Sequence, residues 1–248
     1  MRKGLGLVIS ILMIISLAAC AGNSESKETA ASNTENGASE ETSVTENSQE
    51  ESVPAQTEET ENGDGNILIA YFTYGENAGF SDDVDASASA SIQVFDGEVT
   101  GNTGVMAHMI AEASGGELFS IRTAEPYPDD YDEVVEAGQS EKNDGIRPKL
   151  STHIENLDSY DTVFVGFPNW WYGMPMVMYS FFDEYDFSGK TLIPFCTSGG
   201  SAFSDAIEEI KDMEPEADVL DGLHIGASSV ADAESEVEEW VSKLDLSK

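Results

Sequence analysis

The chain has 248 residues, and its 48 Asp and Glu residues against 11 Lys and Arg give a formal net charge of -37 at pH 7. This length suits one domain with appendages or two small domains. The acidity argues against binding to nucleic acid or directly to anionic lipid, because both require clustered lysines and arginines.

The first 20 residues have the pattern of an export signal. Arg2 and Lys3 precede an apolar run, residues 4–19, that is too short to span a bilayer comfortably. The run ends in Leu-Ala-Ala-Cys, which resembles a bacterial lipobox. This resemblance implies cleavage before Cys20, lipid on its thiol and a lipoprotein anchored to the cell membrane on its outer, extracytoplasmic side. An uncleaved anchor is the alternative.

Residues 21–65 are predicted to be a disordered acidic tether. They contain 12 acidic residues, one lysine and almost no large apolar residue. Such a segment cannot bury enough surface to offset its conformational entropy, and its charges keep it extended. The folded domain is therefore expected to cover residues 66–248.

Apolar runs alternate with helical patterns throughout this domain. The expected strands are residues 66–72, 118–121, 162–167, 189–196 and 219–225, the last interrupted at Asp221-Gly222. The expected helices begin at Gly104 and at a cap formed by Asp129 or Asp130, and then cover residues 175–185, 204–213 and 231–244. This alternation predicts an α/β doubly wound three-layer sandwich around a five-stranded parallel sheet.

Two consecutive strand ends carry unusual loops. The strand at 162–167 runs into Pro168-Asn169-Trp170-Trp171-Tyr172-Gly173, and the next strand into Thr197-Ser198-Gly199-Gly200-Ser201. Ligands bind in the crevice beyond the carboxyl ends of such strands, so a flat aromatic ligand would suit the aromatic loop. The aromatic side chains could equally cover the end of the core.

Together these loops resemble a bacterial branch of the flavodoxin-like family, with the patterns G-[FY]-P-N-W-W-x-x-M-P and K-x-x-x-P-F-x-T-S-G-G. The resemblance covers about residues 66–225 and implies the strand order 2-1-3-4-5 and FMN as cofactor. It also implies that the loops flank the isoalloxazine ring of FMN. One wall would be formed by Pro168, Asn169, Trp170, Trp171, Tyr172 and Gly173, and the other by Thr197, Ser198, Gly199 and Gly200.

The FMN phosphate loop of this family is expected after the first strand, but here it is split. Thr73 would supply the first hydroxyl and Thr100, Gly101, Asn102 and Thr103 the rest, after an insertion of about residues 75–99 whose residues 92–99 predict a hairpin. The alternative, residues 74–77, would place Glu76 beside the phosphate. No Lys or Arg lies between Thr73 and Val105, so neutral donors and a helix dipole would have to hold the phosphate.

The leading functional prediction is an FMN-binding electron carrier or FMN-dependent oxidoreductase, whose redox partner the sequence does not name. No side chain is singled out as catalytic, and no metal site is predicted. The three histidines, His108, His153 and His224, are expected to be structural or exposed, and Cys196 to be a buried free thiol.

Two other classes of function remain open. A hydrolase could use Ser201 with Asp218 or Asp221 and His224, but Phe203 occupies the closing glycine position of the nucleophile elbow. A cofactor-free binding or adaptor lipoprotein is the main alternative, because the fold does not guarantee the cofactor.

Overall fold

A computed structural model describes residues 66–80 and 91–246, all within the second of the two units into which the chain divides, Thr57–Lys248. The predicted signal segment, Cys20 and the predicted tether lie outside the described residues. None of the helices in the described ranges combines the length and apolar character needed to cross a membrane.

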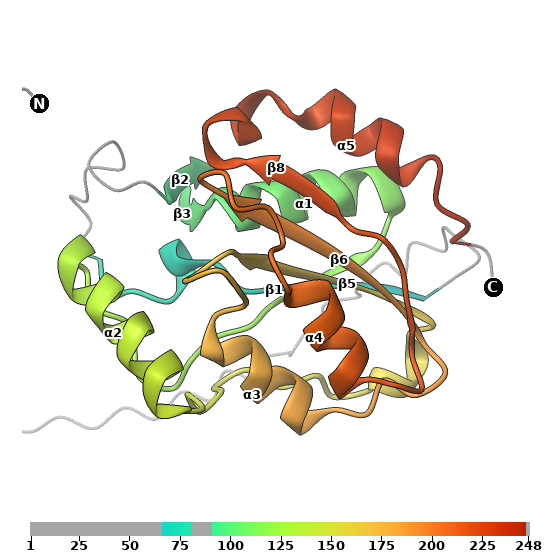
Figure 1. The fold of residues 1–248 in the computed structure, drawn as a ribbon. Coiled ribbons are helices and arrows are strands. Elements are labelled where there is room, and N and C mark those ends of the chain that lie inside the picture. The colour runs from blue at the N-terminus through green and yellow to red at the C-terminus, as the bar shows by residue number, and fades with distance from the viewer. Residues whose placement is uncertain (1–65, 81–90, 247–248) are drawn as a thin grey trace, which may run out of the picture. The chain divides into compact units, whose positions relative to one another are not determined.

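A parallel sheet forms the centre of the domain (Figure 1). Its strands are β1 (Ile67–Tyr71), β4 (Glu117–Ser120), β5 (Thr162–Pro168), β6 (Thr191–Ser198), β7 (Asp218–Val219) and β8 (Leu223–Gly226). The order is β4-β1-β5-β6-β7, with β8 also paired to β6. The predicted order 2-1-3-4-5 is thus confirmed, and the fifth strand is divided into β7 and β8 around Gly222, as its sequence indicated.

Helices cover both faces of this sheet (Figure 1). Helices α1 (Asn102–Ser114) and α5 (Glu234–Val241) lie on one face, and α3 (Met176–Glu184) and α4 (Ala206–Met213) on the other. Helix α2 (Tyr131–Asp144) packs beside the second group. Short 3-10 helices, η1 (Tyr74–Glu76), η2 (Leu157–Ser159) and η3 (Ala227–Asp232), complete the chain.

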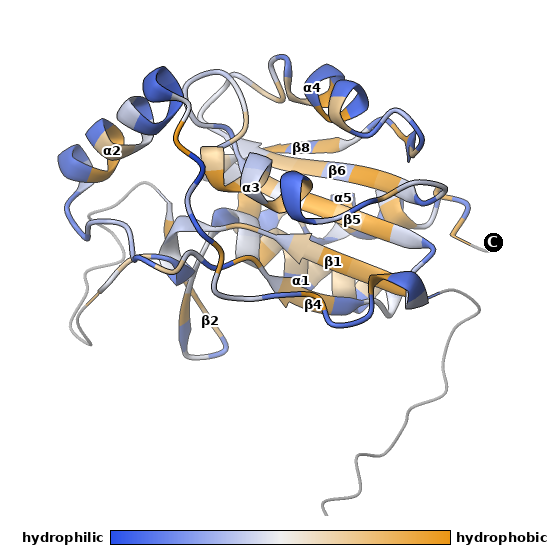
Figure 2. Ribbon diagram, turned by 90° about the horizontal axis from the view of Figure 1, so that it is seen from below, coloured by the Kyte–Doolittle hydropathy of each residue, from blue (hydrophilic) through white to orange (hydrophobic). Residues whose placement is uncertain are grey.

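The strands send alternate side chains to the two helical layers. In β1, Leu68 and Ala70 join the core under α3 and α4, whereas Ile67 and Ile69 join the core under α1 and α5. Both faces are therefore apolar, which explains why the strand sequences show no polar alternation. Figure 2 shows the hydrophobic strands of the sheet, and α2 and α4 with much hydrophilic sequence.

The predicted hairpin within the insertion is confirmed, but it is longer than expected. It comprises β2 (Ile92–Phe95) and β3 (Glu98–Gly101), joined by a turn in which Asp96 and Gly97 have φ values of 51° and 87°. Because β3 leads directly into α1, the helix begins at Asn102, two residues before the expected start. Asn102 and Thr103 therefore lie in the first helical turn rather than in a loop.

Of the two predicted caps of α2, Asp129 and Asp130, the structure has Asp130 as the N-cap. Its Oδ1 accepts hydrogen bonds from the backbone N–H groups of Asp132 and Glu133 at 2.9 and 3.1 Å. This cap satisfies two amides that the helix leaves without internal partners. It fixes the start of α2, whose first turns face the site described next.

Candidate functional site

The two unusual loops lie side by side because β5 and β6 end in register. Pro168 pairs with Thr197 across the sheet, and the next backbone N–H, that of Asn169, donates to the Thr197 carbonyl at 2.8 Å. The carboxyl ends of both strands therefore meet at one edge of the sheet. This is the arrangement that the order of the two motifs predicted.

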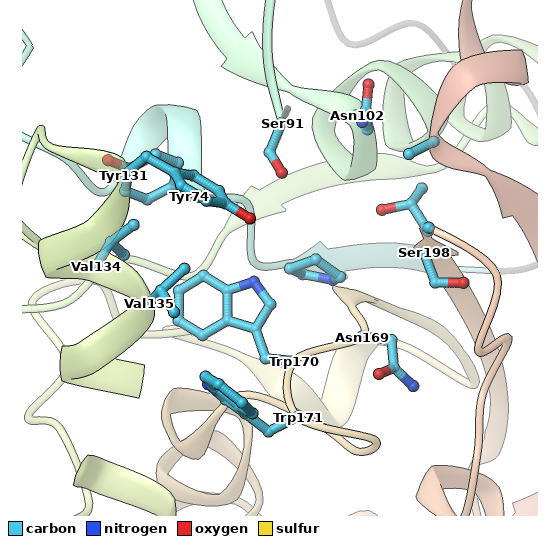
Figure 3. Close-up of a pocket in the computed structure, with 14 residues that line it drawn as sticks. Tyr74, Ser91, Asn102, Tyr131, Val134, Val135, Asn169, Trp170, Trp171 and Ser198 are labelled. Atoms are coloured by element: carbon cyan, nitrogen blue, oxygen red, sulfur yellow. The ribbon is translucent and has the colours of Figure 1, made fainter. Parts of the chain in front are cut away.

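A cavity of about 370 Å³ opens at this edge (Figure 3). Eight of the predicted site residues line it: Asn102, Pro168, Asn169, Trp170, Trp171, Thr197, Ser198 and Gly199. Tyr74, from the alternative phosphate loop, also lines it, and five residues that the sequence did not indicate complete the lining: Ser91, Tyr131, Val134, Val135 and Ala227. Its volume lies within the range of small-molecule sites, and its walls combine aromatic and aliphatic groups with a few polar ones.

A shallower hollow of about 450 Å³ adjoins the cavity and shares Asn169, Trp171 and Gly199 with it. Tyr172 and Gly200, two more of the predicted site residues, line this outer hollow together with Ser201. The space between the two loops therefore continues from the cavity to the surface. A planar ligand could extend through both.

The aromatic loop closes with a strained turn. Backbone hydrogen bonds join Trp170 and Gly173 in both directions, at 3.0 and 3.1 Å, and the two central residues have left-handed φ values, 53° for Trp171 and 62° for Tyr172. Glycine or asparagine usually occupies such positions. Lys142 of α2 steadies the turn by donating to the Trp171 carbonyl at 2.8 Å. Strain of this kind concentrates at functional sites.

Trp170 and Tyr172 of this loop have different environments. The Trp170 ring packs edge-on against Phe72 and Tyr127, with centroid distances of 5.5 and 5.4 Å, and its indole also lines the cavity. Tyr172 is 75% exposed. The sequence left open whether these aromatic side chains contact a ligand or cover the end of the core. The Trp170 side chain partly covers the core, whereas the Tyr172 side chain does not.

The Asn169 side chain connects the two loops by hydrogen bonds. Its Nδ2 donates to the Ala202 carbonyl at 2.8 Å and to Ser204 Oγ at 3.1 Å. Ala202 and Ser204 both have left-handed backbones, with φ values of 49° and 50°. The Asn169 amide therefore helps to hold the second loop in this left-handed conformation.

The split loop is brought together at the N-terminus of α1. Gly101 is the N-cap residue and no side chain caps the helix, while the Asn102 N–H donates to the Ser91 carbonyl at 3.1 Å. The positive end of the helix dipole at this terminus favours an anionic group. Gly101 is required there because a Cβ would lie 2.1 Å from Thr73 Oγ1. Thr103 Oγ1 and Thr197 Oγ1 form a 2.8 Å hydrogen bond, which joins α1 to the second loop.

Thr100 makes a contact that the sequence did not predict. Its hydroxyl donates to Glu76 Oε1 at 2.6 Å, and the same carboxylate accepts from the Tyr71 and Ser120 hydroxyls and from Arg122 Nη2. The Glu76 side chain is only 8% exposed. Glu76 thus ties the end of β1 to β3 and β4 across the insertion.

The alternative phosphate loop, residues 74–77, is mainly structural. Asn77 Nδ2 donates to the carbonyls of Thr73 and Ile121. Tyr74 lines the cavity, but its hydroxyl donates to the Pro128 carbonyl at 2.6 Å, and burial raises the pKa of this phenol to about 12.

The histidines do not form the hypothetical hydrolase triad. His108 stacks on Phe95, His153 Nδ1 contacts Glu184, and His224 Nε2 lies 2.8 Å from Ser198 Oγ, so the imidazole of His224 is engaged by Ser198. The predicted buried thiol is confirmed: Cys196 is fully buried, and burial raises its pKa to about 12.

These features define an α/β protein with a doubly wound sheet and a cavity at the carboxyl ends of its strands. The sequence profile of the flavodoxin family matches residues 91–244. The chain therefore belongs to the flavodoxin family.

Solved structures of candidate flavoproteins are similar to this chain. A candidate flavoprotein from Bacteroides uniformis is 29% identical, with a TM-score of 0.55 over 73% of this chain and 100% of that one. A second, from Bacteroides eggerthii, is 27% identical, with a TM-score of 0.51 over 70% and 98% of the two chains. A comparison with curated proteins found no match.

Residues of the site that the sequence missed come mostly from α2. Tyr131, Val134 and Val135 occupy positions i, i+3 and i+4 of that helix, and so share one face. This spacing was visible in the sequence. The sequence could not assign this helix face to the site, because that assignment depends on where α2 packs.

We predict that Glu76→Gln destabilises the fold by about 3 kcal/mol, because a neutral amide cannot accept from all four donors that converge on the carboxylate. Urea unfolding measures this change. Glu112→Gln, on an exposed position of α1, is the matched control and should stay within about 0.5 kcal/mol of the parent. Equal unfolding midpoints for the two variants would contradict the structural role of Glu76.

A second prediction concerns the strained turn. Tyr172→Gly should leave the free energy of unfolding unchanged or raise it by up to about 1 kcal/mol, since glycine adopts positive φ without steric cost. Tyr131→Gly is the control, because Tyr131 is also exposed but has helical geometry, where glycine should be destabilising. Thermal unfolding of both variants tests this. An equal loss of stability in the two would show that the turn is not strained.

Proposed function

We propose that the chain binds FMN noncovalently between its two loops and serves as an electron carrier or FMN-dependent oxidoreductase. The observation that carries the proposal is the convergence of the aromatic loop, the Ser198 loop and the N-terminus of α1 on one cavity. Family membership supports it independently. Bound flavin would supply the redox chemistry, which the protein tunes through its contacts.

The residues present are suited to the different parts of FMN. Trp170 and Pro168 offer apolar surface to a planar ring, and Asn169, Ser198 and the Gly199 backbone offer polar contacts at its edge. The first turn of α1, beyond the Asn102 N–H that donates to the Ser91 carbonyl, would place backbone donors and the positive end of the helix dipole near the phosphate. The cavity walls would exclude water from the ring.

The same arrangement favours electron transfer over acid–base catalysis. Two titratable groups at or beside the cavity are already engaged: the Tyr74 phenol donates to the Pro128 carbonyl, and His224 contacts Ser198. The outer hollow beside Tyr172 leaves one edge of the site open to a partner. Electrons can pass through such an edge without a proton donor from the protein.

The purified chain should quench the fluorescence of added FMN, and it should bind FMN about tenfold or more tightly than riboflavin, which lacks the phosphate. Fluorescence titration with both ligands measures this. Asn102→Asp is a nearly isosteric variant that keeps an acceptor for Gln93 Nε2, 2.7 Å away, but places a carboxylate beside the phosphate. It should weaken FMN binding and leave riboflavin binding unchanged.

The outcomes separate the alternatives. Equal affinities for FMN and riboflavin would contradict the phosphate position at α1. If neither ligand binds, the flavin proposal fails and the cofactor-free binding or adaptor lipoprotein becomes the better account.

We further propose that the protein works outside the cytoplasmic membrane, anchored by lipid on Cys20 and separated from the membrane by the acidic tether. The Leu-Ala-Ala-Cys sequence and the charged, apolar segment before it support this proposal. The redox partner would then lie within reach of the tether.

In a bacterial host, the parent chain should incorporate labelled fatty acid and fractionate with membranes, whereas Cys20→Ser should do neither. Cys196→Ser is the control, because it removes the other cysteine, and it should remain lipidated. An unlabelled parent chain in the aqueous fraction would contradict the anchor.

A further inference from the structure

Ser198, at the end of β6, sits between a histidine and two backbone amides. Its Oγ lies 2.8 Å from His224 Nε2 and accepts hydrogen bonds from the N–H groups of Gly200 and Ala202 at 3.1 and 3.0 Å. A hydroxyl has two acceptor sites and one donor. Because the amides occupy both acceptor sites, the serine proton must point to Nε2.

This arrangement requires a neutral imidazole whose Nε2 carries no proton. Protonation would turn Nε2 into a donor aimed at an oxygen that already accepts two hydrogen bonds. Burial of His224 acts in the same direction, because it lowers the pKa of the imidazole. The neutral form is therefore the one compatible with the observed loop.

The two amides that Ser198 holds belong to the strained part of the second loop. Gly200 and Ala202 have φ values of 139° and 49°. Ala202 is also the residue whose carbonyl accepts from Asn169, the brace to the aromatic loop. A change at Ser198 is thus transmitted through Ala202 to both walls of the cavity.

We propose that His224 is a positioning residue of the flavin site: its neutral imidazole holds Ser198, Ser198 holds the loop at residues 199–202, and protonation of His224 releases that loop and weakens flavin binding. The proposal rests on the proposed function for its ligand. The hydrogen bonds that link His224, Ser198 and the loop do not depend on the proposed function.

The groups around His224 allow this titration to be assigned. In β6, the register partner of His224 is Cys196, whose raised pKa keeps it neutral. The carboxylate of Glu236 in α5 raises the pKa of His224, in opposition to burial. Burial is the larger effect. The pKa of His224 therefore lies below its ordinary value, and the loop should be intact at neutral pH and released in acid.

FMN affinity should be measured from pH 8 to pH 5 for the parent and for His224→Gln. The glutamine side chain can still accept from Ser198 but does not titrate. Below the pKa of His224, the dissociation constant of the parent should rise about tenfold per pH unit relative to the variant, as expected for one linked proton. The FMN phosphate titrates in both proteins, so its effect cancels in the comparison.

Two further variants sharpen the test. His153→Gln removes an exposed histidine paired with Glu184 and should retain the pH profile of the parent. Ser198→Ala leaves the two amides without their acceptor, so it should bind FMN more weakly at neutral pH and lose the His224-linked pH dependence. If the parent and His224→Gln have the same pH profile, the proposal is overturned.

A measurement without flavin separates this proposal from the proposed function. In NMR spectra of the apoprotein, the amide signals of Gly200 and Ala202 should shift with the same apparent pKa as the His224 ring. If they do and FMN does not bind, the positioning role stands and the flavin proposal fails. If the amides are insensitive to pH while His224 titrates, the positioning role is wrong whether or not FMN binds.

Discussion

The parallel ladder between β5 and β6 is the constraint on which the whole site depends. Seven residue pairs, from Thr162 with Thr191 to Pro168 with Thr197, keep the two strands in register to their carboxyl ends. A slip of one residue would turn the apolar side chains to the wrong helical layer. Since both faces are buried, the register is strongly specified, and the loops that follow the strands must meet.

The meeting of these loops is stabilised by polar contacts rather than by apolar packing alone. Asn169 joins the aromatic loop to Ala202, Thr197 joins the second loop to Thr103 of α1, and Ser198 connects that loop to His224. Each contact is buried or partly buried, and each fixes a backbone that carries strain or a helix terminus. These contacts preorganise the loops, and preorganisation lowers the cost of ordering a site when a ligand binds.

The insertion before α1 could have separated the two parts of the first loop, and Glu76 prevents this. The carboxylate gathers hydroxyls from β1, β3 and β4, and Arg122 balances its charge. An acidic side chain therefore lies next to the proposed phosphate site without lining the cavity. The Glu76 carboxylate would repel a phosphate bound by residues 74–77. Its contacts instead make Glu76 a structural residue.

Local patterns in the sequence predicted the layers, the hairpin turn and a cap at Asp129 or Asp130, because each depends on residues within one element. The strand order, which depends on pairing between distant elements, was implied by the family resemblance instead. The start of α1 was predicted two residues late, since the length of β3 depends on pairing between Ile92 and Gly101. Contacts across long stretches of chain, such as Thr100 with Glu76 or Ser198 with His224, leave no periodic signal. The helical spacing of the α2 face was visible, but its assignment to the cavity depends on where α2 packs.

The most direct test of the central claim is a crystal structure of the chain grown with FMN. The account predicts the isoalloxazine ring between the loops that carry Trp170 and Ser198, with the phosphate at the first turn of α1. A flavin bound elsewhere on the domain, or a cavity that stays empty at saturating FMN, would contradict it.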